Sequence, residues 1–212
     1  MHLAPILHSI AAAAERGGGP TIPLWLQLAY TAFVCLLVPV YWIKYGPGNF
    51  LWFSDIALFA TAMALWLESG FLASMMAVGV LLPEVVWNAS FFARLLFGVR
   101  VTGLADYMFD RGKPLYLRAL SLFHVALPPI LLWLLHRMGY DPRAWIAQTL
   151  LAWVVLPATY LLTDPAENVN WVFGPGSSPQ RRLPPLLYLG IVMAFFPLAV
   201  YLPTHLVLSR VF

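Results

Sequence analysis

The segment 71–96, FLASMMAVGVLLPEVVWNASFFARLL, decides the fold class of this chain. It is long enough to cross the hydrocarbon core of a bilayer, which takes about 20 mainly apolar residues. Yet it carries Glu84 and Asn88, which are four residues apart and therefore share one face of a helix. A charge at the centre of a bilayer costs at least about 2.5–3.5 kcal/mol, so we expect this face to meet other helices rather than lipid.

The composition of the whole chain agrees with a membrane protein. Of its 212 residues, 61% are hydrophobic and only 10% are charged, whereas a soluble surface is about 25–35% charged. No charged stretch is long enough for a soluble appendage, so we predict a single transmembrane domain over 1–212. The net charge of +3 is scattered, which excludes a nucleic-acid-binding patch.

Apolar runs separated by turn sequences predict an all-α, polytopic bundle of about six spans. The runs are continuous rather than alternating, which argues against a β-barrel. We interpret the segment 1–20, MHLAPILHSIAAAAERGGGP, as a short N-terminal helix in the membrane interface. The predicted spans are 22–43, 50–68, 71–96, 115–137, 143–163 and 184–207.

The distribution of Lys and Arg predicts the orientation. With six spans, Arg16, Arg137, Arg143 and Arg210 fall on one side of the membrane. The other side carries twice as many and is therefore predicted to be cytoplasmic. We expect a multi-pass protein of the bacterial inner (cytoplasmic) membrane, with membrane lipids around it. The residues on the predicted cytoplasmic side are Lys44, Arg94, Arg100, Arg111, Lys113, Arg118, Arg181 and Arg182.

Counting helical rise from that side places polar groups of several spans at similar depths. We predict that Glu84 pairs with His124 and that Asp55 pairs with Asn88. Isolated ionisable groups are costly in hydrocarbon, so these groups should face a shared interior cavity. Two interpretations stay open: a hydrogen-bonded network that only fixes helix register, or a cavity with groups for proton transfer or metal binding.

Two stretches resemble a known clan of small polytopic membrane proteins. YGPGNFLWFSDIALF at 45–59 and HVALPPILLWLLH at 124–136 are similar to signatures of the androgen-induced and androgen-dependent transmembrane hydrolases and of bacterial integral membrane proteins of the YwaF type. In those hydrolases a threonine and a histidine cleave lipid esters. The resemblance implies that His124, followed by Leu127 and Pro128, is that histidine. The threonine position falls on Trp52, and Ser54 lies two residues further on.

The leading functional hypothesis is handling of a lipid or amphiphile in the cavity, by hydrolysis or acyl transfer. A proton-linked small-molecule transporter and a non-catalytic subunit of a membrane complex are alternatives, and a homo-oligomer stays open. We predict no cofactor, and no metal site, because only one His lies at the right depth. The predicted catalytic residues are His124, Glu84 and Asp55, and the predicted substrate-binding residues are Asn88, Ser121, Ser54, Asn170 and Asp164.

Overall fold

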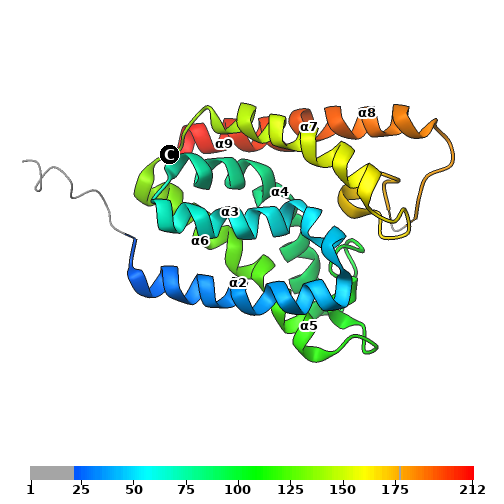
Figure 1. Ribbon diagram of the computed structural model, residues 1–212, viewed down its shortest axis with the longest axis horizontal. Helices are drawn as coiled ribbons and strands as arrows, with labels where there is room; N and C mark the ends of the chain where they lie inside the picture. The colour runs from blue at the N-terminus through cyan, green and yellow to red at the C-terminus, as the bar shows by residue number, and fades with distance from the viewer. Residues whose placement is uncertain (1–21, 177) are drawn as a thin grey trace, which may run out of the picture.

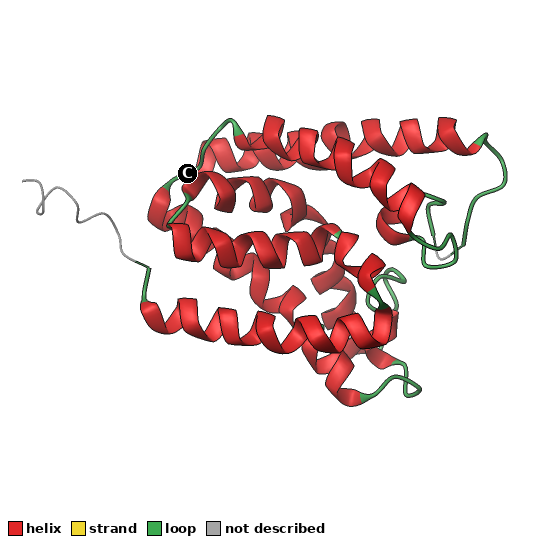
Figure 2. Cartoon of the chain, viewed as in Figure 1, coloured by secondary structure: helices red, strands yellow, loops and turns green. Residues whose placement is uncertain are grey.

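A computed structural model describes residues 22–176 and 178–212 of the chain. These residues form helices joined by loops, with no strand among them, so the predicted all-α bundle is confirmed (Figures 1 and 2). The predicted interfacial segment 1–20 lies outside the described residues. The α-helices are α2 (Leu24–Tyr45), α3 (Phe53–Leu67), α4 (Gly70–Phe97), α5 (Leu115–Leu120), α6 (Phe123–Met138), α7 (Ala144–Leu162), α8 (Pro185–Phe195) and α9 (Leu202–Val211).

Five helical segments are long and apolar enough to cross a membrane, and the chain is therefore a multi-pass membrane protein. They are α2, α4, α5 with α6, α7, and α8 with α9. The second predicted span, 50–68, contains only the 15-residue helix α3, which rises about 22 Å. It is shorter than expected because Pro47–Leu51 form a separate 3-10 turn, η1, and Trp52 then adopts an extended backbone.

Two of the long segments are interrupted. Between α5 and α6 the chain makes a turn at Ser121 and Leu122. Between α8 and α9, residues Phe196–Tyr201 form a π-helical turn, η4, that begins next to Pro197. Proline lacks an N–H donor and disrupts the regular helical ladder, and such π-turns often lie at functional sites. Phe196, the first residue of η4, lines the cavity described below.

Helix α4 is the central element of the bundle. It packs against α3, α6, α7 and α9, and its buried face includes Glu84 and Trp87. The loops 46–52, 98–114 and 163–184 lie at one end of the bundle, on the right in Figure 1, and we call this the loop end. The first turn of α2, the last turn of α3 and the C-terminus lie at the other end. The loop end is the end that the distribution of Lys and Arg predicts to be cytoplasmic.

A close approach of α4 and α7 depends on Gly79. A Cβ atom added there would lie 2.6 Å from Nε2 of Gln148, and Gln148 is only 2% exposed. The Nε2 atom donates a hydrogen bond to the Tyr201 hydroxyl at 3.4 Å. Helices α7 and η4 are thus held together next to a contact that has no room for a methyl group.

We therefore expect Gly79→Ala to lower the free energy of unfolding by about 1–3 kcal/mol, as overpacking usually does. Thermal unfolding in detergent, followed by circular dichroism, measures the effect. Gly190→Ala is the matched control, because a Cβ at Gly190 meets nothing within 4 Å and alanine is the better helix former. Equal melting temperatures for the two variants would contradict this account of Gly79.

Candidate functional site

A cavity of about 880 Å³ opens at the loop end of the bundle. Its size is typical of pockets that bind small molecules, which measure about 300–1,000 Å³. Its wall combines helix residues with residues of the loops 98–114 and 163–184, and nine of the lining side chains are Phe, Trp or Tyr. Asp55, Glu84, Ser121 and His124 also line it, so the structure brings the main predicted site residues together.

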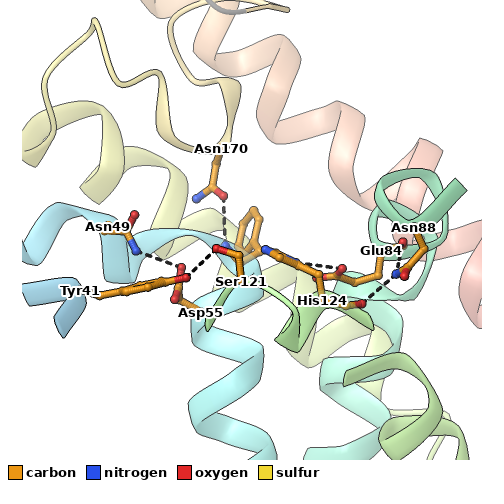
Figure 3. A network of polar contacts seen from close by, with 9 residues as sticks. Tyr41, Asn49, Asp55, Glu84, Asn88, Ser121, His124 and Asn170 are labelled. Atoms are coloured by element: carbon orange, nitrogen blue, oxygen red, sulfur yellow. Dashed lines mark hydrogen bonds and ion pairs between the residues drawn. The ribbon is translucent and has the colours of Figure 1, made fainter. Parts of the chain in front are cut away.

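Glu84 and His124 form the central contact of this site. Nδ1 of His124 lies 2.8 Å from Oε1 and 3.0 Å from Oε2 of Glu84 (Figure 3). The side chain of Glu84 is 3% exposed and that of His124 is 14% exposed. The predicted Glu84–His124 pairing is thus confirmed. Because Glu84 engages Nδ1, the second ring nitrogen, Nε2, stays available on the cavity side and has no hydrogen bond within the described residues.

Aromatic side chains fix the orientation of the imidazole. The His124 ring stacks with Phe123 at a centroid distance of 4.1 Å and with Trp87 at 4.7 Å. Trp87 is itself buried and stacked with Phe91. Its indole Nε1 is buried as well. The histidine therefore stands in a rigid apolar setting.

Asn88 has a different role from the predicted one. Its Nδ2 donates hydrogen bonds to the backbone oxygens of Glu84 and His124, both at 2.8 Å. The amide thus ties α4 to the first turn of α6 and positions the Glu84–His124 pair. Asn88 is not among the residues that line the cavity. The predicted pairing with Asp55 is wrong, because helical depth alone does not say which way a side chain points.

Asp55 pairs with Asn49 instead, whose Nδ2 lies 3.3 Å from Oδ2 of the carboxylate. The Asp55 side chain belongs to the first turn of α3 and is 3% exposed. Its Oδ1 atom is buried and has no partner within the described part of the chain. The Asp55 carboxylate in the cavity wall therefore has few hydrogen-bond donors within the described residues.

Ser121 and Tyr41 form a second buried contact in the cavity wall. Their hydroxyl oxygens lie 2.8 Å apart, and Ser121 also donates to the backbone oxygen of Leu117 at 3.2 Å. Tyr41 is only 4% exposed, whereas its neighbour Trp42 is 57% exposed. Tyr41 therefore faces the interior of the bundle, and Trp42 faces outward near the end of α2, as aromatic side chains at a membrane interface do.

The other predicted binding residues differ in their placement. Ser54 lines the cavity. Asn170 also lines it, but its side chain is engaged by the backbone: Nδ2 donates to the Leu51 oxygen at 2.7 Å and Oδ1 accepts from the Phe53 N–H at 3.1 Å. Asp164 is exposed, accepts a hydrogen bond from the Ala166 N–H and does not line the cavity. Its role is to stop α7 with a turn, as Asp before Pro often does.

Charged residues surround the mouth of the cavity. Asp106 forms ion pairs with Arg94, at 2.5 Å, and with Arg100. Nζ of Lys113 lies 5.4 Å from the ring centre of Tyr45 and 5.6 Å from that of Tyr107. Burial raises the pKa of the Tyr107 phenol far above its usual range, so its hydroxyl stays neutral. The aromatic partners of Lys113 were not predicted, since the sequence of the loop 98–114 does not show which side chains of the loop and of α2 come together.

No group of three or more His, Cys, Asp or Glu side chains suitable for a metal ion occurs within residues 22–176 and 178–212. Comparison with protein-family models, with curated proteins and with solved structures finds no match to this chain. The resemblance to the transmembrane hydrolases therefore stays a prediction. What the described residues establish is a multi-pass helical membrane protein that encloses a carboxylate–imidazole pair in an aromatic cavity.

Proposed function

We propose that the cavity binds an ester-containing amphiphile and that His124 acts as a general base in its hydrolysis or acyl transfer. The proposal rests on the different surroundings of the two ring nitrogens of His124. Nδ1 contacts Glu84, whereas Nε2 has no hydrogen bond in the described residues, and His124 lines a cavity of about 880 Å³. A carboxylate that accepts from Nδ1–H keeps the basic lone pair on Nε2 and stabilises the imidazolium that forms during reaction.

In the hydrolytic reaction, Nε2 takes a proton from a water molecule whose oxygen bonds to the acyl carbon. The carbonyl oxygen then carries the negative charge of the tetrahedral intermediate. As the bond to the leaving oxygen breaks, the imidazolium returns its proton to that oxygen, which gives a carboxylic acid and an alcohol. In acyl transfer, a substrate hydroxyl replaces the water. No hydroxyl side chain is hydrogen-bonded to Nε2 in the described residues, which favours this route over a Ser nucleophile.

The chain would carry out this reaction in the cytoplasmic membrane of a bacterium, with the cavity mouth on the cytoplasmic side. The excess of Lys and Arg at the loop end supports this orientation. The exposed apolar side chains on the outer faces of α2 and α7, among them Leu36 and Val154, suit direct contact with lipid tails. A lipid substrate would then reach the cavity without leaving the membrane.

Release of fatty acid by the purified full chain from monoacylglycerol, lysophospholipid and phospholipid in mixed micelles tests the proposal. We expect turnover with at least one of these esters, and we expect Glu84→Gln to reduce kcat by about 10- to 100-fold, because the amide no longer stabilises the imidazolium. Glu167→Gln is the matched control, since Glu167 also lines the cavity but is exposed and forms no hydrogen bond or ion pair with His124 in the described residues. Equal kcat values for the two variants would contradict the assigned role of the pair.

A further inference from the structure

We infer that the cavity selects amphiphiles whose polar head carries a protonated amine, and that Asp55 is the group that recognises this ammonium. The inference rests on the proposed function in that it names the substrate class for the same cavity. It is carried by observations at Asp55 rather than at His124. The two groups belong to different helices, because Asp55 is in the first turn of α3, whereas Glu84 lies in the middle of α4.

The first observation is that Asp55 lacks partners. A carboxylate can accept hydrogen bonds at about four lone-pair sites. Asp55 receives only one hydrogen bond in the described residues, a long one of 3.3 Å from Asn49, and Oδ1 has none. No Lys, Arg or His side chain forms an ion pair with it among residues 22–176 and 178–212. Buried carboxylates are normally paired with a cation.

The second observation is the charge balance of the inner cavity wall. Asp55 and Glu84 are both 3% exposed, and within the described part of the chain the only basic group in contact with either of them is the His124 imidazole on Glu84. The basic residues at the mouth are engaged elsewhere: Arg94 and Arg100 pair with Asp106, and Lys113 lies over tyrosine rings. An anionic head group here would meet the unpaired carboxylate of Asp55, whereas an ammonium would neutralise it.

The third observation is the aromatic wall. Tyr41, Trp52, Phe53 and Trp87 are among the lining side chains, and aromatic faces attract cations within about 6 Å of the ring centre. The protein gives an example at the mouth of the same cavity, where the ammonium of Lys113 lies between 5.4 and 5.6 Å from two tyrosine rings. The wall is therefore suited to an alkylammonium group, and a primary amine would also supply the N–H donors that Asp55 lacks.

Two probes of equal chain length test the inference. Octylammonium and 1-octanol are titrated, by isothermal calorimetry, into the purified full chain in micelles of the uncharged detergent dodecyl maltoside, with empty micelles as blank. We expect octylammonium to bind about 10- to 100-fold more tightly than octanol, which is the factor that a charge-assisted hydrogen bond contributes. Equal affinity of the two probes, or no binding of octylammonium, would overturn the inference without any substitution in the protein.

Asp55→Asn then assigns the selectivity to this carboxylate. The variant should lose the preference for octylammonium and bind octanol as the wild type does. Asp110→Asn is the matched control, because Asp110 is exposed on the same end of the molecule and does not line the cavity. A preference for octylammonium that persists in Asp55→Asn would refute the role of Asp55.

The failure of this inference is distinguishable from that of the proposed function. Glu84→Gln should slow turnover and leave the tenfold or greater preference for octylammonium in place. Normal selectivity together with unchanged turnover in Glu84→Gln would reject the catalytic proposal alone. Equal binding of octylammonium and octanol, together with slowed turnover in Glu84→Gln, would reject only the inference that the cavity selects an ammonium group.

Discussion

His124→Gln is expected to lower kcat for fatty-acid release by about 100- to 10,000-fold, the range that a positioned general base contributes. Glutamine has no basic nitrogen to replace Nε2, so the attacking water keeps its proton. KM should change little, because the aromatic wall and Asp55 remain in place. The measurement is the initial rate of release from the best substrate of the micelle assay, as a function of substrate concentration.

The fold should survive this substitution. Asn88 bonds to the backbone oxygen of His124, not to its side chain, so the link between α4 and α6 does not depend on the imidazole. His136→Gln is the matched control, because His136 is an exposed histidine near the far end of the same helix. Comparable kcat values in these two variants would exclude His124 as the base.

Asn170→Ala is expected to produce the largest loss of stability, about 2–5 kcal/mol in the free energy of unfolding. Asn170 is 1% exposed and satisfies the Leu51 oxygen and the Phe53 N–H across 119 and 117 positions of the chain. Removal of its amide leaves these buried backbone groups without partners, at about 1–3 kcal/mol each. The measurement is reversible unfolding in mixed micelles of dodecyl maltoside and dodecyl sulfate, followed by circular dichroism.

Asn170→Gly separates hydrogen bonding from backbone strain. Asn170 has a φ of 51°, a conformation that asparagine and glycine adopt readily but alanine does not. The glycine variant should therefore lose the hydrogen bonds without the added strain and should be less destabilised than the alanine variant. If both variants unfold like the wild type, Asn170 does not hold the start of α3.

The sequence predicts the parts of this structure that depend on apolar length. Five of the six expected spans contain the helices that can cross a membrane, because a bilayer imposes a minimum run of apolar residues. The start of α3 was not predictable in this way. Phe50, Leu51 and Trp52 are as apolar as the helix that follows, and their exclusion from α3 depends on Asn170, which is distant in sequence.

The candidate site, too, could be predicted from the sequence only in part. The Glu84–His124 contact follows from depth, since both helices have a fixed rise per residue. The depth of a residue does not show which way its side chain points from the helix axis. It also does not reveal hydrogen bonds between side chains and the backbone. For that reason Asn88 and Asn170 were interpreted as ligand-binding groups, whereas the structure uses both to hold helices in place.

The short length of α3 has a consequence for the surrounding bilayer. A hydrophobic helix of about 22 Å is mismatched to a hydrocarbon layer of about 30 Å. If α3 crosses the bilayer, the leaflet thins, or water enters, beside one of its ends. At the first turn, either response would bring the head-group layer to the level of Asp55. A lipid in such a locally thinned leaflet would bring its polar head group to the protein with little movement along the bilayer normal.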